Sequence, residues 1–314
     1  MNYYFAPMEG LTDSIYRKAH HAHFTGVTRY YMPFISPTVH RTLTPRETRE
    51  LPKADSVPFT AVPQLLTKVS EDFLWAAGVC RDLGYEEVNL NVGCPSGTVT
   101  AKGKGAGMLR DLDHLRHFLD DIYASAPLPI SVKTRRGCED PAEFPALIEI
   151  FNDYPICELT VHPRVRKDFY NGNVNMDAFR YCLEVSKIPV CYNGNLCSVS
   201  QIEAFQKEFP QVEAVMIGRG LIGDPGMLTP GGTTADTLEH FMDTLLEEYQ
   251  IAFGSARNAM FRLKENWHLL AYRFDGSEKL IKRLRKTTDL TEYKQITHDI
   301  FHTLPLSPEL RAEW

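Results

Sequence analysis

The segment EEVNLNV at residues 86–92 alternates polar and apolar residues, and the turn GCPSG at 93–97 follows it directly. Alternation over this length predicts a strand, and the glycines and proline predict that the strand ends there. A glycine-rich stretch, TVTAKGKGAG, runs on from residue 98 to residue 107. The predicted strand therefore carries two asparagines, and a single thiol lies in the turn that follows it. The question is what chemistry these three groups serve.

Segments of similar character recur through the first 220 residues, and stretches with helical spacing separate them. The predicted strands are 3–7, 28–35, 59–66, 86–92, 128–135, 156–162, 188–194 and 213–220, and the clearest helices are 70–83, 112–124 and 199–209. Eight strands alternating with helices predict an α/β fold, a (β/α)8 TIM barrel. An open doubly wound sheet is the alternative, but no GxGxxG follows the first strand.

A second region follows the last strand. The stretch GDPGMLTPGGTTAD at 223–236 is typical of a linker, and apolar residues then recur at helical spacing over 237–301. We expect a catalytic barrel at 1–235 and a small helical domain at 236–314.

Composition restricts the class of protein. The chain has 314 residues and a net charge of −6, and its seven cysteines include no CxxC pair. This usage indicates reduced thiols and no zinc site, so we expect a cytoplasmic protein without a metal. The first residues lack the pattern of a signal peptide, and no apolar run is long enough to cross a membrane.

Candidate site residues, most of them polar, stand at nearly every predicted strand end, where the loops of a barrel form one face. They are Pro7 and Met8, Gln64, Asn89, Asn91 and Cys94, Lys133 and Arg135, His162 and Arg164, Asn193 to Asn195, and Gly218 to Gly220. Glycines and Arg219 at the last two ends suit a phosphate, because backbone N–H groups can approach it. Lys133 can stabilise negative charge, and the amides of Gln64 and Asn91 suit the edge of a heterocycle. The set predicts a site for flavin mononucleotide, FMN.

Each residue also has a plainer interpretation. Lys133 can pair with a carboxylate, His162 can be a core histidine, and residues 193–195 can be only a turn. Met8 can simply pack. We expect Cys80, Cys157, Cys182 and Cys191 to be small buried groups, whereas Cys94 lies in a turn and is the candidate functional thiol.

Several stretches together resemble the tRNA-dihydrouridine synthase family. They are APMEGLTD (6–13), PQLL (63–66), NLNVGCPS (89–96), KGKGAGMLRD (102–111), SVKTR (131–135), VHPR (161–164), YNGN (192–195) and MIGRG (216–220). The resemblance covers residues 3 to about 226 in the family's order. The Asn-x-Gly-Cys-Pro element is its most specific part.

The resemblance implies a role for each matching residue. Pro7, Met8, Gln64, Lys133 and His162 would contact the flavin ring, and Asn193, Gly194, Asn195, Gly218 and Arg219 would hold the ribityl phosphate end. Asn91 would orient the target uracil, Cys94 would be the general acid, and Arg135 and Arg164 would lie near the substrate pocket.

The implied reaction is the reduction of the C5=C6 bond of uridines in tRNA, with NADPH as the reductant of the flavin. Hydride from flavin N5 adds at C6, and a group on the opposite face must protonate C5. A thiol near its ordinary pKa of about 8.5 is mostly protonated at neutral pH and can be that acid. A glycine-rich loop would let Cys94 close over a base that has left its stack.

A folded RNA also needs a surface that contacts its backbone. The run KLIKRLRK supplies Lys279, Lys282, Arg283, Arg285 and Lys286, and Arg257, Arg262 and Lys264 lie nearby in sequence. The plainer interpretation of this run is a solvated helix face. With the barrel beside it, we expect a tRNA-binding surface on a protein that acts as a monomer.

Two rival functions share many of these features. A flavin barrel acting on a small pyrimidine, similar to dihydroorotate dehydrogenase, would not need the cationic helical region. A non-enzymatic RNA-binding protein with the barrel as scaffold would not need Cys94, Lys133 and His162 together.

Overall fold

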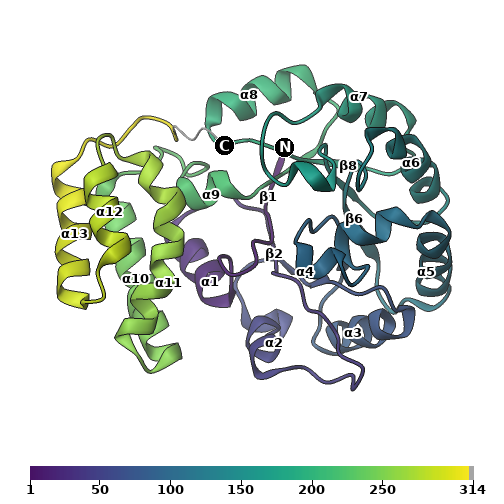
Figure 1. Ribbon diagram of the computed structural model, residues 1–314, viewed down its shortest axis with the longest axis horizontal. Helices are drawn as coiled ribbons and strands as arrows, with labels where there is room; N and C mark the ends of the chain where they lie inside the picture. The colour runs from purple at the N-terminus through teal and green to yellow at the C-terminus, as the bar shows by residue number, and fades with distance from the viewer. Residues whose placement is uncertain (311–314) are drawn as a thin grey trace.

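The computed structural model describes residues 1–310 and consists of a parallel β-barrel with a bundle of helices at its side (Figure 1). The strands are β1 (Asn2–Phe5), β2 (Arg29–Tyr31), β3 (Ala61–Val62), β4 (Gln64–Leu65), β5 (Val88–Val92), β6 (Ile130–Arg135), β7 (Leu159–His162), β8 (Val190–Asn193) and β9 (Ala214–Ile217). Neighbouring strands are parallel, in the order β3-β2-β1-β9-β8-β7-β6-β5-β4.

The barrel closes through a strand that proline interrupts. The predicted strand 59–66 is split at Pro63, so that β3 pairs with β2 and β4 pairs with β5. Proline has no N–H to donate to a ladder, which explains the break. Its carbonyl still accepts from the Asn89 N–H at 2.8 Å. Counting β3 and β4 as one, the eight predicted strands and the predicted TIM barrel are confirmed.

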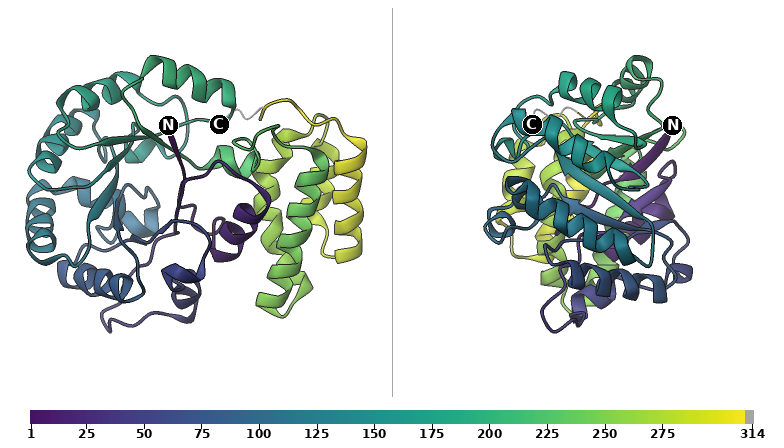
Figure 2. Two further views of the ribbon diagram at one scale, coloured as in Figure 1. Left: turned by 180° about the vertical axis from the view of Figure 1, so that it is seen from behind. Right: turned by 90° about the vertical axis from the view of Figure 1, so that its right-hand side faces the viewer.

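Helices surround the barrel (Figures 1 and 2). They are α1 (Ser14–His23), α2 (Pro45–Glu50), α3 (Ser70–Asp82), α4 (Gly97–Thr100), α5 (Leu112–Ser125), α6 (Phe144–Asn152), α7 (Met176–Val185), α8 (Val199–Glu208) and α9 (Arg219–Gly223). Short 3-10 turns are η1 (Ala54–Ser56), η2 (Gly105–Arg110), η3 (Pro141–Glu143), η4 (Arg166–Asp168) and η5 (Ala271–Arg273). The three helices predicted most clearly from the sequence match α3, α5 and α8 to within a residue at each end.

Helix α5 illustrates why these segments are helical. Asp111 caps it by accepting a hydrogen bond from the His114 N–H at 3.0 Å. Leu115, Phe118 and Leu119 follow at helical spacing and are all buried. The apolar stripe is therefore covered by the barrel wall, and most of the helix's stability comes from that burial.

The helical region consists of α10 (Ala235–Phe253), α11 (Ala256–Leu270), α12 (Glu278–Lys286) and α13 (Leu290–Thr303). It lies at one side of the barrel, next to α1 and α9 (Figures 1 and 2). The apolar residues predicted to share a face of α10, from Leu238 to Tyr249, are buried. Helix α10 begins beside the predicted domain boundary, and Gly254 ends it with a φ of 59°.

Charged groups connect the two regions at two places. Arg262 of α11 pairs with Asp13 at 2.6 Å and donates to the Gly10 carbonyl, beside the first strand end. Arg273 and Asp224 form a second ion pair at 3.4 Å, and both are buried. Because α11 is held against the β1–α1 loop, the helical region is positioned next to the mouth of the barrel.

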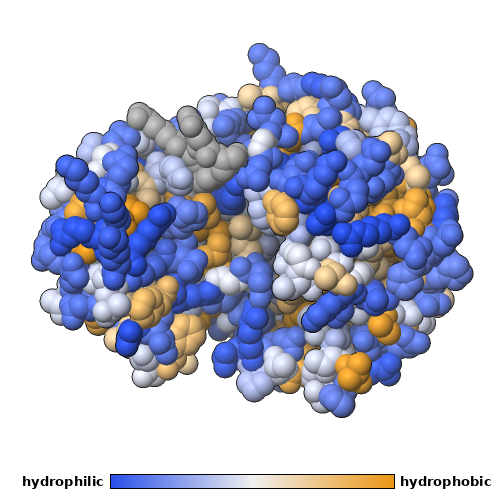
Figure 3. Space-filling view, viewed as in Figure 1, coloured by the Kyte–Doolittle hydropathy of each residue, from blue (hydrophilic) through white to orange (hydrophobic). Residues whose placement is uncertain are grey.

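The amino end of the barrel is filled. Tyr4 and Tyr31 both donate to Glu158, at 3.0 and 3.4 Å, and apolar neighbours such as Val62 and Met216 complete this layer. A site can therefore open only at the carboxyl end. On the face seen in Figure 1, a hollow lies between the barrel and the helical region (Figure 3). Among the described residues, no helix is long and apolar enough to cross a membrane.

Burial differs from expectation at one cysteine. Cys80, Cys182 and Cys191 are buried as expected, but Cys157 is exposed. It lies in the connection between α6 and β7, at the amino end of the strand and outside any helix or strand. All seven cysteines are free thiols.

Candidate active site

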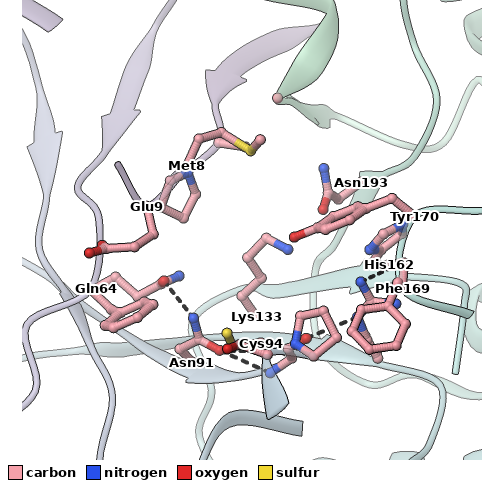
Figure 4. Close-up of a pocket in the computed structure, with 18 of the residues that line it drawn as sticks. Met8, Glu9, Gln64, Asn91, Cys94, Lys133, His162, Phe169, Tyr170 and Asn193 are labelled. Carbon is pink, nitrogen blue, oxygen red and sulfur yellow. Dashed lines mark hydrogen bonds between the residues drawn. The ribbon is translucent and has the colours of Figure 1, made fainter. Parts of the chain in front are cut away.

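A cavity of about 680 Å³ opens at the carboxyl ends of the strands. Its wall includes groups from all eight predicted strand ends, and Figure 4 shows labelled residues from several of them converging on one space. The lining residues are Ala6, Pro7, Met8, Glu9, Phe34, Gln64, Asn91, Gly93, Cys94, Pro95, Ser96, Thr98, Val99, Lys133, Arg135, His162, Phe169, Tyr170, Asn193, Gly194, Asn195, Gly218 and Arg219. The size is typical of a cofactor site.

A chain of buried hydrogen bonds answers the question that the two asparagines raise. Ser131 donates to Glu87 at 2.5 Å, and the Asn89 Nδ2 donates to Ser131 at 2.9 Å. The Gln64 Nε2 donates to the Asn89 Oδ1, and the Asn91 Nδ2 donates to the Gln64 Oε1, both at 2.7 Å. Each donation determines which way the next amide faces. The orientation of Asn91 is thus set from the closed end of the barrel.

Asn91 in turn holds the turn that carries Cys94. Its Oδ1 accepts from the N–H groups of Gly93 and Cys94, at 3.0 and 2.9 Å. The Cys94 sulfur points into the cavity, below Lys133 (Figure 4). Burial raises the pKa of this thiol, and the nearby charges of Arg135 and Lys133 only partly oppose the effect. At neutral pH Cys94 therefore keeps its proton.

The glycine-rich stretch packs around Cys94. A Cβ on Gly105 would come within 3.0 Å of the Cys94 Cβ and carbonyl oxygen, and one on Gly107 within 2.8 Å of the Thr100 carbonyl. The Ala106 N–H donates to the Cys94 carbonyl at 3.1 Å. Residues 105–109 are buried. These glycines are needed for close approach, and the closing motion expected of this loop stays a prediction.

Lys133 and His162 share a buried, positively charged part of the cavity. Burial, helped by Arg135, lowers the pKa of Lys133 to about 8, so its ammonium persists at neutral pH. Burial lowers the pKa of His162 well below its usual value. The Arg164 Nη1, which can only donate, lies 3.0 Å from the His162 Nε2. His162 is therefore neutral and carries its proton on Nδ1.

Among the residues predicted to hold a phosphate, Asn193 lies at the opposite end of the cavity from Gln64 (Figure 4). Gly194, Asn195, Gly218 and Arg219 also line the cavity. The Arg219 Nη2 donates to the Asn195 Oδ1 at 2.9 Å, and the Asn193 Nδ2 donates to the Met216 carbonyl at 2.7 Å. A Cβ on Gly194 would lie 2.0 Å from the Tyr192 hydroxyl, so only glycine fits. Burial lowers the pKa of Arg219 to about 10, so it stays charged.

Pro7 and Met8 form the apolar side of the cavity at the end of β1. The Met8 N–H donates to the Thr12 Oγ1 at 2.9 Å, which secures the backbone there. A Cβ on Gly218 would lie 3.1 Å from the Met8 sulfur. Met8 therefore has room for its side chain because residue 218 is a glycine. The ends of β1 and β9 form one surface.

Arg135 and Arg164 act on the loop after β7. Arg135 donates to the carbonyls of Gly93, Val165 and Phe169, at 2.9, 3.0 and 2.7 Å. Arg164 is buried behind the cavity wall, where it donates to His162 and to the Gly172 carbonyl. Arg135 reaches the cavity surface, but Arg164 does not line it. The structure thus places Arg164 behind the residues it was expected to accompany.

Phe169 and Tyr170, which were not expected at the site, line the cavity from that loop and are each 42% exposed. The Arg135 and Arg219 guanidinium carbons lie 5.4 and 5.3 Å from the Tyr170 ring centre, and this ring stacks on His162. Phe169 has a φ of 49°, which glycine adopts far more readily. Two adjacent aromatic residues in a charged loop after a strand end were the available signal.

Glu9 and Phe34 also line the cavity and were missed. No residue of the predicted strand 28–35 had been expected at the site. Glu9 comes directly after Met8, and its carboxylate pairs with Arg46 at the rim. Phe34 lies in the predicted strand 28–35, beyond the end of β2.

The cations of the helical region have three different environments. All five in α12, from Lys279 to Lys286, are exposed, and they lie on a largely hydrophilic surface (Figure 3). Arg283 lies 3.7 Å from Glu292, a weak surface pair. Arg257 is exposed, whereas Lys264 donates to backbone carbonyls at the end of α12. Arg262 is part of the contact with the barrel.

Comparisons with known proteins agree with this architecture. A sequence model of the family described as "Dihydrouridine synthase (Dus)" matches residues 4–305. A "Probable tRNA-dihydrouridine synthase" of Rickettsia bellii is 31% identical over 185 residues, which are 56% of each chain. The "tRNA-dihydrouridine synthase B" of Pasteurella multocida is 25% identical over 284 residues, 90% of this chain and 81% of that one.

Among solved structures, "Morphinone reductase" superposes with a TM-score of 0.51 and 12% identity, over 72% of this chain and 84% of that one. An "old yellow enzyme homologue from zymomonas mobilis" gives 0.51 and 11%, over 71% and 86%. At these identities the likeness concerns the fold alone.

The family match, together with the barrel fold, assigns the chain to the flavin-dependent oxidoreductases. The match over residues 4–305 is decisive about the family: the chain belongs to the dihydrouridine synthase family. The resemblance found in the sequence is thereby confirmed, and the predicted activity, reduction of uridine in tRNA, is confirmed at the level of the family.

Proposed function

We propose that this chain binds FMN in the barrel cavity, is reduced by NADPH, and reduces specific uridines of tRNA with Cys94 as the proton donor. The observation that carries the proposal is the position of Cys94. Its protonated sulfur points into the cavity that Lys133, Gln64 and Asn91 share.

The cavity residues fit a flavin nucleotide. Amide groups of Gln64 and Asn91 lie at one end, the charged Lys133 lies in the middle, and the neutral His162 lies toward the other end, near Asn193. At that end, the glycines at 194 and 218 let backbone N–H groups approach a phosphate, and Arg219 supplies positive charge. Pro7 and Met8 supply an apolar surface for a flat ring.

Reduced flavin, when bound, supplies a hydride to C6 of uracil. The chain must then place a proton on C5 from the other face. Cys94 is suited to this because burial keeps its sulfhydryl neutral until it is needed. Asn91 holds the Cys94 backbone through its Oδ1 and has an amide N–H group with which to orient a pyrimidine.

Lys133 and His162 have complementary tasks. The Lys133 ammonium offsets negative charge on the ring system, and this charge is lost as the pH rises through about 8. The neutral His162 can only share its Nδ1 proton, because Arg164 occupies Nε2.

The remaining assignments concern partners. No dinucleotide fingerprint is present in the sequence, so NADPH would use the same open cavity. The exposed cations of α12, with Arg257, would contact the tRNA backbone. We further propose that the enzyme is a cytoplasmic monomer.

One experiment tests the central proposal. Purified protein is incubated with NADPH and an unmodified tRNA transcript, and dihydrouridine is measured by nucleoside analysis; denatured protein is assayed for released FMN. We expect FMN release and NADPH-dependent dihydrouridine. A protein that cannot be reconstituted with FMN contradicts the cofactor, and turnover of free uridine but not tRNA favours the small-pyrimidine rival.

A further inference from the structure

Two histidines and a glutamate converge on the surface of the helical region, away from the barrel cavity. His298 and His302 lie one turn apart on α13, and Glu239 faces them from α10. One ligand atom from each of the three lies within 4.8 Å of the others. In Figure 1, α13 is the helix farthest from the barrel. The catalytic proposal does not use this cluster.

The distances suit a metal ion as well as a hydrogen bond. The His302 Nε2 lies 2.9 Å from one Glu239 oxygen, and the His298 Nδ1 lies 3.6 Å from the other. In a tetrahedral zinc site with bonds of about 2.0–2.2 Å, ligand atoms lie roughly 3.3 Å apart. The two observed distances fall on either side of that value. Modest side-chain rotations would bring all three atoms onto one ion.

The scaffold beneath the cluster is rigid. Leu238, Phe241 and Met242 of α10 are buried on either side of Glu239 in the sequence, and Ile296, Ile300 and Phe301 of α13 are buried around the histidines. The imidazole rings already lie side by side, with centroids 4.1 Å apart. Because both helices are fixed by their cores, the ligand atoms are brought together at little cost in conformational entropy.

Two further charged residues lie near the cluster. Asp243, one turn along α10, interacts with Glu239 and adds negative charge, and Lys294 of α13 partly offsets it. Among residues 1–310, Glu239 pairs with both histidines. The cluster therefore combines two imidazoles with local negative charge, a donor set suited to zinc rather than to calcium or magnesium.

We propose that Glu239, His298 and His302 form a zinc site that ties α10 to α13, with water in the remaining position. The two histidines are exposed and Glu239 is half-buried, so the three ligands suit weaker binding than a closed four-ligand structural zinc site. The proposal differs from the expectation of a protein without a metal. That expectation was based on cysteine spacing, which says nothing about histidines on one helix that face a glutamate on another.

The test uses the full chain after removal of metal by a chelator, with zinc chloride titrated in a calorimeter. We expect one equivalent to bind to the wild type, at least about tenfold weaker binding to His298→Ala or His302→Ala, and none at this site in the double variant. His114→Ala, an exposed histidine on α5, is the matched control and should bind as the wild type does. Glu239→Gln keeps a similar shape but should bind more weakly.

Two further measurements separate this site from the thiols. Bound cobalt should lack the charge-transfer absorption of a thiolate ligand, which would identify Cys157 or Cys94 instead. A hundredfold excess of zinc over its Kd should raise the unfolding midpoint of the wild type by a few degrees, and not that of the double variant. Undiminished binding by the double variant, or no stoichiometric binding by the wild type, overturns the proposal.

Discussion

The floor of the barrel cavity and the exposed face of α12 both attracted a functional interpretation, but the structure treats them differently. Around the cavity, amides are buried and each bonded to the next, from Ser131 through Asn89 and Gln64 to Asn91. On α12, the five cations are exposed, and Arg283 makes only a long contact with Glu292.

The exact position of a side chain matters in the cavity and matters much less on α12. A buried amide that loses its partner costs the full desolvation penalty, so each member of the cavity chain has one position and one orientation. An exposed lysine is free to move and contributes mainly through its charge. A single substitution in the cavity should therefore change activity strongly, whereas several cations of α12 must be replaced together before tRNA binding changes measurably.

The largest effect is expected at the end of the amide chain. Cys94→Ala should slow uridine reduction by about 10²- to 10⁴-fold, the usual contribution of a general acid. Reduction of the flavin by NADPH should be unchanged, because that step needs no proton from Cys94. Cys157→Ala is the matched control and should keep full activity, since Cys157 lies at the amino end of the barrel. Equal turnover by the two variants would remove Cys94 from the mechanism.

Breaking the chain in its middle should affect both stability and catalysis. Asn89→Leu removes the acceptor for Gln64 and the donor to Ser131, and should lower the free energy of unfolding by about 2–3 kcal/mol. Activity should also fall, because Asn91 loses its fixed orientation. Denaturant unfolding and steady-state kinetics measure the two effects. Asn258→Leu, at an exposed site of α11, is the control. A stable variant with normal kinetics would show that the chain does not position Asn91.

The α12 surface should give a smaller and more gradual effect. Replacing Lys282, Arg283 and Arg285 together with alanine should weaken tRNA binding about tenfold at moderate salt and reduce its salt dependence. Flavin content and the reduction rate at saturating tRNA should be unchanged. A matched triple variant of Arg81, Arg180 and Lys207, exposed on barrel helices, should bind normally. Equal losses in both would mean that charge alone, and not this surface, is responsible.

The smallest effect is expected at Phe169. Glycine adopts its φ of 49° without strain, so Phe169→Gly should raise the free energy of unfolding by up to about 1 kcal/mol. Loss of the exposed ring from the cavity should raise the KM for tRNA several-fold. Arg41 also has a φ of 49° but lies outside the cavity, so Arg41→Gly should share the first effect only. An unchanged KM for Phe169→Gly would show that the Phe169 ring does not contribute to substrate binding.

Much of the site could be predicted because barrel strands place their ends together whatever the side chains are. Cys94, Lys133 and His162 could be found by asking what each strand end offers. Phe169 and Tyr170 could not, because they lie several residues beyond β7 and reach the cavity only through the loop that Arg135 and Arg164 hold. Arg262 resembled the other cations in sequence, and only its contact with Asp13 assigns it to the junction between the two regions.

Local periodicity and short motifs were enough to predict the alternation of strands and helices, the order of the strand ends and the family. The folded structure was needed to show which way Asn89, Gln64 and Asn91 face, that burial raises the pKa of Cys94, and that Glu239 meets two histidines from another helix. Those properties depend on burial and on distances between residues far apart in the chain, which local pattern does not contain.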